Sequence, residues 1–236
     1  MHSYQNYING TFTAPSSGKT FDTVNPYTGE VWASIAHSDA SDVDSAVDAA
    51  RNAFDSGWAE MKPTERGRLL YKLADLIERD ATHLAEIEVR DNGKLIAEMS
   101  AQTHYMPQWY RYYGGLADKV EGAVIPTDKD GIFNFTRYEP LGVIGMITAW
   151  NSPLLLMTWK LAVALAAGNT AIVKPSEFTS ASTLEFMNLI EEAGFPPGVI
   201  QFVTGDGDTG RALVGHAGVD KVSFTGGTEV AQHIQR

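Results

Sequence analysis

Residues 141–177 decide the fold, and they read LGVIGMITAWNSPLLLMTWKLAVALAAGNTAIVKPSE. The apolar run at 143–148 predicts a strand, the stretch Leu154–Ala167 predicts a helix, and the apolar run at 170–173 predicts a second strand. Strands that are covered on both faces read as continuous apolar runs. This strand–helix–strand unit therefore predicts a buried parallel sheet.

The rest of the C-terminal half repeats the same unit. Further strands are expected at Val199–Val203 and Lys221–Phe224, and further helices at Thr179–Ala193, Thr209–Val214 and Thr228–Arg236. Four strand–helix units in succession predict an α/β fold with a doubly wound parallel sheet. The last predicted helix reaches the final residue without a cap, glycine or proline, so we expect a partial chain.

The N-terminal half predicts short strands, helices and a hairpin. The expected strands are Tyr7–Ile8, Thr20–Val24 and Val31–Ile35. Two helices are expected to begin at Ser38-Asp39 and at Pro63-Thr64, and two more are expected to cover Thr82–Arg90 and Leu95–Ala117. A hairpin is expected to join strands at 123–126 and 132–138. We divide the chain into an N-terminal part (1–121), a protruding hairpin (122–139) and a βαβ core (140–236).

The composition excludes several classes of function. The 236 residues contain no cysteine, which excludes thiolate metal sites, redox CxxC chemistry and a cysteine nucleophile within this chain. The histidines show no metal-ligand spacing, so no metal site is expected. The net charge of −11 argues against nucleic acid as a partner.

The uncharged stretch from residue 141 to residue 159 is long enough to raise the question of a membrane span. Asn151-Ser152-Pro153 interrupts its middle, and Gly142 and Gly145 interrupt its start, so we expect a buried strand, a turn and a helix instead. The N-terminus MHSYQNYINGTF has neither a basic region nor an apolar region of the kind that secretory signals carry. We expect a soluble, cytoplasmic protein.

Ligands of open parallel sheets bind beyond the carboxyl ends of the strands. Residues 205–210 (GDGDTG) match the G-x-G-x-x-G dinucleotide fingerprint, but Asp206 and Asp208 would place carboxylates where a pyrophosphate should lie. We favour a tight strand–helix turn over a phosphate cradle there. Gly226 and Gly227 are better phosphate candidates, because glycine permits close backbone approach at the start of a helix.

Lys174 and Glu177 form the most informative pair. A carboxylate that accepts from ribose hydroxyl groups, beside an ammonium that donates to them, can hold a ribose; a solvated ion pair in a loop is the alternative. If the pair binds a ribose, Glu177 would repel a 2′-phosphate, which favours NAD over NADP. Asn151 follows a strand and could donate to a developing oxyanion, or could serve only the turn before Pro153.

Taken together, these segments resemble one family. The sequences PLGVIG (140–145), WNSP (150–153), AAGNT (166–170), KPSE (174–177), GFPPGV (194–199) and FTGGT (224–228) occur in this order. The chain closely resembles the N-terminal half of the NAD(P)-dependent aldehyde dehydrogenases over essentially all of its length. Gly227 departs from the family pattern, in which serine is more usual, and Ala231 stands where a second glycine is common.

The resemblance implies a role for each matching residue. Asn151 is expected to help hold the oxyanion formed from the aldehyde. The residues expected to contact the cofactor are Ile147, Thr148, Ala149, Trp150, Lys174, Ser176, Glu177, Gly207, Asp208, Phe224, Gly226, Gly227 and Val230. The fold that the resemblance implies is the aldehyde dehydrogenase variant of the Rossmann fold.

The resemblance also implies a mechanism that this chain does not complete. In the family a cysteine thiolate attacks the aldehyde, hydride passes to the nicotinamide, and a water activated by glutamate hydrolyses the thioester. Both residues are expected downstream of the turn at 224–228. We therefore expect a cofactor-binding half that takes NAD rather than NADP, is inactive alone, and in full length forms a homodimer or homotetramer that oxidises an aldehyde.

Two alternatives remain at this point. The chain could be a non-catalytic nucleotide-binding or assembly module, or an unrelated Rossmann dehydrogenase that uses the glycines at 205–210. The second alternative predicts that replacing Lys174 and Glu177 leaves the affinity for NAD unchanged.

Overall fold

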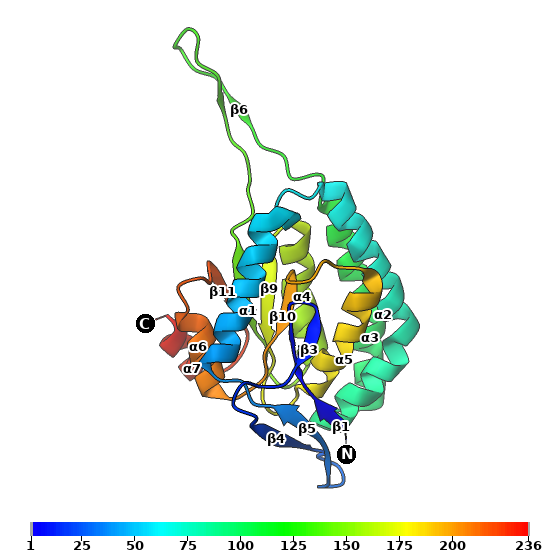
Figure 1. Cartoon of the computed structure of the whole chain (residues 1–236). Helices are drawn as coiled ribbons and strands as arrows, with labels where there is room; N and C mark the ends of the chain where they lie inside the picture. The colour runs from blue at the N-terminus through cyan, green and yellow to red at the C-terminus, as the bar shows by residue number, and fades with distance from the viewer. Residues whose placement is uncertain (1, 236) are drawn as a thin grey trace.

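The computed structural model describes residues 2–235 and is built around a six-stranded sheet with helices on both faces (Figure 1). The strands lie in the order β11-β8-β9-β10-β2-β3. The strands β8 (Val143–Ile147), β9 (Thr170–Lys174), β10 (Ile200–Phe202) and β11 (Lys221–Phe224) are parallel, and β2 (Asn6–Ile8) and β3 (Thr11–Thr13) add an antiparallel edge. The parallel sheet is confirmed, whereas β3 was not predicted.

The chain winds in both directions from β8. Helices α4 (Pro153–Ala166) and α5 (Ala181–Ala193) lead from β8 to β9 and from β9 to β10. Helix α6 (Gly207–Gly215) then returns the chain to β11, on the other side of β8. The carboxyl ends of the four parallel strands therefore meet at one edge, with the change of winding direction at β8.

The strand residues alternate between two apolar layers. Ile144, Met146, Ala171, Val173 and Phe202 face the large core beneath α2, α3, α4 and α5. Their neighbours Val143, Ile172 and Val203 face a smaller core beneath α1 and α6. Because successive strand side chains point to opposite faces, one apolar run fills both cores.

The first helix begins as the sequence predicts. In α1 (Ala40–Ala53), the Asp39 side chain accepts hydrogen bonds from the backbone N–H groups of Ser41 and Asp42. The Asp42 side chain in turn accepts a hydrogen bond from the Asp39 N–H, so the two residues form a capping box. The π-helix η1 (Phe54–Trp58) follows and was not predicted. Earlier in the chain than α1, the strands β1 (His2–Tyr4), β4 (Thr20–Val24) and β5 (Val31–Ala36) form a separate three-stranded sheet in the order β1-β5-β4.

Helix α2 corrects one prediction. It runs without a break over Pro63–Asn92, so the separate helix expected at Thr82–Arg90 is wrong. No glycine or proline occurs between residues 68 and 92, and the buried Ile77, Ala81 and Leu84 continue one apolar face across the expected break. Gly93, in the left-handed region with φ 73°, ends the helix. The aromatic helix α3 (Ile96–Leu116) matches its prediction and packs along α2.

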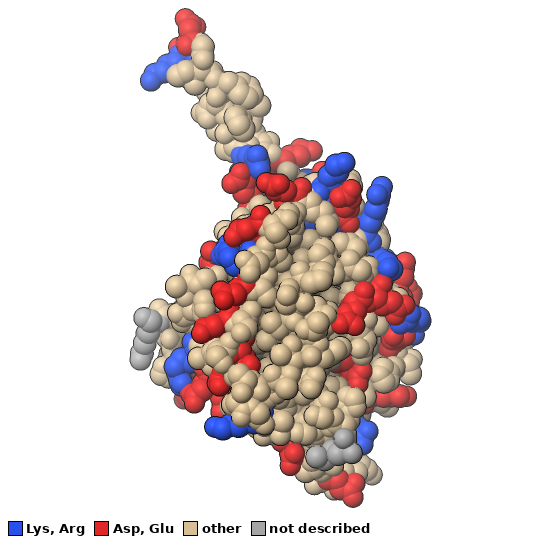
Figure 2. All heavy atoms as spheres, viewed as in Figure 1, with Lys and Arg blue, Asp and Glu red and all other residues tan. Residues whose placement is uncertain are grey.

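The hairpin of β6 (Val124–Ile125) and β7 (Asn134–Phe135) projects from the body, as Figure 1 shows. Its two strands pair only with each other among the described residues, Val124 with Phe135 and Ile125 with Asn134, and they are shorter than the predicted strands. Charged residues lie at its tip and base but not along its shaft (Figure 2). Among residues 2–235, no helix has the length and apolarity needed to cross a bilayer.

The remaining helix boundaries differ slightly from those expected. Helix α5 begins at Ala181, because Thr179 and Ser180 form a turn with Ser176, and α6 begins at Gly207, because Asp206 caps it. Helix α7 covers Thr228–Ile234. The end of the predicted last helix, Arg236, lies outside the described residues.

Two buried carboxyl groups predict how stability depends on pH. Burial raises the pKa of Glu88 to about 8 and that of Asp91 to about 6. Between about pH 4 and pH 8 the folded state retains protons that the unfolded chain loses, so the free energy of unfolding falls as pH rises through this window. Glu88→Gln is expected to flatten that fall and to be more stable than the wild type at pH 9.

Urea denaturation at pH 5, 7 and 9 checks this prediction. Glu86→Gln is the matched control, because Glu86 lies exposed on the same helix. An equal pH dependence in the wild type and both variants would contradict it.

Candidate functional site

The segments that follow the parallel strands line one cavity of about 820 Å³. After β8 the cavity is lined by Ile147, Thr148, Ala149, Trp150 and Asn151; after β9 by Lys174, Ser176 and Glu177; from α6 by Gly207; and after β11 by Phe224, Gly226, Gly227 and Val230. The structure thus brings together all of the predicted site residues except Asp208.

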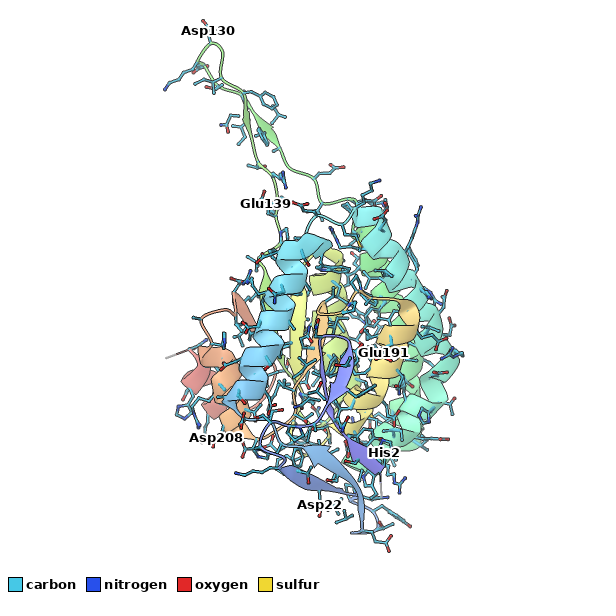
Figure 3. All side chains as sticks on the ribbon, viewed as in Figure 1. His2, Asp22, Asp130, Glu139, Glu191 and Asp208 are labelled. Carbon is cyan, nitrogen blue, oxygen red and sulfur yellow. The ribbon has the colours of Figure 1, made fainter. Side chains whose placement is uncertain are left out.

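Asp208 lies beside the cavity and not in its lining. Its carboxylate forms an ion pair with Arg211, one turn along α6, and Arg211 does line the cavity. Figure 3 labels Asp208 at α6, on the outer side of the molecule. Asp208 therefore contacts a residue of the cavity lining, Arg211, through this ion pair.

The glycine-rich segment at 205–210 forms the strand–helix turn that the sequence favoured. Asp206 is the N-cap of α6, and its carboxylate accepts from the Asp208 N–H at 2.9 Å. Gly205 has φ 153°, and a Cβ there would overlap Thr209 Oγ1. The Asp208 N–H and the nearby His37 hold the pKa of Asp206 below its usual range. A carboxylate therefore already occupies the helix terminus at which the fingerprint would bind a phosphate.

Lys174 and Glu177 face each other inside the cavity. The Lys174 ammonium is 4% exposed and stands 3.6 Å from Glu177 Oε2. Burial lowers the pKa of Lys174, and the Glu177 carboxylate opposes that shift. The separation exceeds a direct hydrogen bond, so both groups keep capacity for hydroxyl groups of a ligand.

The loop after β8 presents Trp150 and Asn151 to solvent. Trp150 is 53% exposed, and Asn151 is also exposed, immediately before the buried Ser152 and Pro153 that begin α4. Thr148, between β8 and this loop, is hydrogen-bonded to β9, since its N–H donates to the Lys174 carbonyl at 3.3 Å. This bond joins the beginning of the loop after β8 to the beginning of the loop after β9.

The two glycines of the turn after β11 differ in their surroundings. A Cβ on Gly226 would overlap the Phe224 ring, so the backbone and the ring are in close contact. Gly227 is the N-cap of α7, with extended backbone (φ −70°, ψ 152°), and nothing lies within 4 Å of a Cβ placed there. The backbone of this turn is therefore open to a ligand on the Gly227 side.

Sequence reasoning missed several lining residues. They are Phe178, Gly210, Arg211, Val214, Thr225, His233 and Ile234. Gly207, Gly210, Arg211 and Val214 follow the spacing of one helical face, and so do Val230, His233 and Ile234. Applied to α6 and α7, this periodicity would have found them. The two faces form a slot whose walls include Val214, Val230 and Ile234.

Comparison with known proteins places the chain in one family. The family model described as "Aldehyde dehydrogenase family" matches residues 12–236. The chain is 48% identical to the (Z)-2-((N-methylformamido)methylene)-5-hydroxybutyrolactone dehydrogenase of Acinetobacter baylyi, covering 100% of the chain and 48% of that protein. It is 50% identical to the mitochondrial aldehyde dehydrogenase of Homo sapiens, covering 98% of the chain and 45% of that protein.

Solved structures agree with the sequence comparison. The NAD+ complex of an aldehyde dehydrogenase from Bacillus cereus has a TM-score of 0.96 at 46% identity, covering 99% of this chain and 48% of that one. The chain spans about half the length of the curated relatives it matches. The family match, the identity to these enzymes and the shared fold together show that this chain belongs to the aldehyde dehydrogenase family.

Proposed function

We propose that this chain binds NAD in the cavity at the carboxyl edge of its sheet and forms the cofactor-holding part of an enzyme that oxidises an aldehyde to a carboxylic acid. The observation that carries the proposal is the convergence of the strand-end segments of β8, β9 and β11, together with helix α6, on one cavity in which the buried Lys174 stands beside the partly exposed Glu177. The NAD+ complex of the Bacillus cereus relative supports the choice of cofactor.

The residues present fit a dinucleotide. The Lys174 ammonium and the Glu177 carboxylate offer a donor and an acceptor to the hydroxyl groups of a ribose. The apolar walls of the slot between α6 and α7 suit a flat base, and the open backbone at Gly227 suits a pyrophosphate. These three subsites belong to one cavity, as a single extended ligand requires.

The chemistry is divided between the cofactor and the protein. When bound, NAD supplies the hydride acceptor. We assign to Asn151 the role of donating its amide N–H to the oxygen of the aldehyde as negative charge develops there. The chain contains no cysteine, so a thiolate that attacks the aldehyde must come from outside these 236 residues. A cytoplasmic location stays a prediction.

The Lys174–Glu177 pair gives a direct test of cofactor binding. Lys174→Ala is expected to weaken the binding of NAD about tenfold or more, the loss of roughly 1.4 kcal/mol or more that a charge-assisted hydrogen bond represents. Glu177→Gln removes the charge that repels a 2′-phosphate, so the affinity for NADP should rise relative to that for NAD. Isothermal titration of the purified chain with both dinucleotides measures these changes.

The control for this test is Glu192→Gln, which breaks an exposed ion pair with Arg79 on the surface between α2 and α5. It should leave both affinities unchanged. Wild-type affinity for NAD in Lys174→Ala would contradict the assignment of the ribose subsite.

The glycine turn offers a second test. Gly226→Ala places a methyl group against the Phe224 ring, so the ring or the turn must move and NAD should bind at least several-fold more weakly. Gly215→Ala is the matched control, since its methyl group meets open space and Gly215 does not line the cavity. Equal loss of affinity in both variants would indicate that the crowding at Phe224 is not the cause.

We also propose that the chain divides into residues 1–121, an oligomerisation hairpin at 122–139 and a cofactor core at 140–236. The hairpin supports this role because its shaft exposes apolar side chains away from the body: Val124 is 69%, Phe133 71% and Phe135 57% exposed. Isolated two-stranded hairpins are marginal in water, so a partner surface would stabilise this one.

Substitution on the hairpin tests its role in assembly. Val124→Lys/Phe135→Lys is expected to convert an oligomer into a monomer without unfolding the body, because charge on the shaft opposes burial against a partner. Light scattering coupled to size exclusion measures the mass, and circular dichroism checks the fold. An unchanged oligomer would contradict the proposal.

A further inference from the structure

The last turns of α2 carry two buried carboxyl groups that do not line the cavity. Glu88 is 1% and Asp91 2% exposed, and three residues of helix place them on the same face. Burying a carboxyl group is costly unless other groups compensate it. For Asp91 the compensation comes from the beginning of α5, the helix that follows the Lys174–Glu177 loop.

Asp91 caps α5 from outside that helix. Its Oδ2 accepts from the backbone N–H of Ala181 at 2.9 Å, and its Oδ1 accepts from Thr23 Oγ1 at 2.5 Å. Ala181 is the first residue of α5, and the N-cap residue Ser180 makes no side-chain cap of its own. A remote carboxylate therefore satisfies a backbone donor that helix ends ordinarily pair with a local side chain.

A short series of hydrogen bonds joins this cap to the cavity. Ser180 Oγ donates to the Ser176 carbonyl at 2.9 Å, and the Thr179 N–H donates to the same oxygen at 3.1 Å. Ser176 and its neighbour Glu177 line the cavity. The position of Asp91 therefore sets the position of the loop that presents Lys174 and Glu177.

Glu88 lies three residues earlier and differs from Asp91. It makes no cap of this kind: its Oε1 has no hydrogen-bond partner among the described residues, and burial raises its pKa.

We propose that Asp91 is a positioning residue of the dinucleotide site: the end of α2 holds the Lys174–Glu177 loop through the first turn of α5. This inference rests on the proposed binding of NAD. Asp91 does not line the cavity; it acts through the helix that it caps.

AMP reports the ribose loop, and NAD reports the whole site. Asp91→Ala removes both acceptor oxygens, so it should weaken AMP and NAD alike, by about tenfold, which corresponds to about 1.4 kcal/mol. Thr23→Val is the matched control: it removes one bond to Asp91 but keeps the bond from Ala181, so it should lower the melting temperature and leave AMP affinity unchanged.

Ser180→Ala, which removes only the bond from Ser180 to Ser176, is the milder variant for the ribose loop if Asp91→Ala does not fold. It should weaken AMP and NAD in the same direction, by a smaller factor.

Titration calorimetry and thermal melting of the purified 236-residue chain measure these quantities. Folded variants that melt earlier but bind AMP and NAD with wild-type affinity would overturn the positioning role and reduce Asp91 to a structural anchor. A wild-type chain that binds neither AMP nor NAD would instead overturn the proposed function, so the two failures are distinguishable.

Discussion

The parallel pairing of β8 with β9 on one side and β11 on the other is the constraint on which the rest of the structure depends. Parallel neighbours require crossover helices, and the helices cover both faces of the sheet. The same pairing brings all of the strand-end segments to one edge. A single cavity then forms from residues that are as far apart in sequence as Ile147 and Ile234.

The helix beginnings around the cavity show two ways of satisfying backbone donors. Helices α1 and α6 are capped locally, by Asp39 and Asp206. Helix α5 follows the loop that carries Glu177, and the Asp91 carboxylate of α2 serves it instead. A local cap fixes only its own turn, whereas a remote cap fixes the distance between two elements. The remote cap lies next to a loop that lines the cavity.

Much of the site could be predicted because its chemistry is local. Lys174 and Glu177 lie three residues apart after an apolar run, and the Asp206 carboxylate in the turn at 205–210 already argued against a phosphate there. The missed residues, such as Arg211 and His233, lie on helix faces whose orientation depends on packing. The break expected in α2 was wrong for a related reason: Ala81 is buried, and its burial depends on which elements pack against α2.

By itself, the sequence determined the alternation of apolar strands with helices and the residues at the strand ends, since both depend on neighbours along the chain. The lack of a thiol nucleophile in these 236 residues follows from the composition alone. Only the tertiary structure decided that β2 and β3 extend the sheet, that Asp208 stands outside the cavity, and that Asp91 lies at the beginning of α5. These depend on which surfaces meet, and burial, unlike hydrophobic periodicity, is a property of the whole chain.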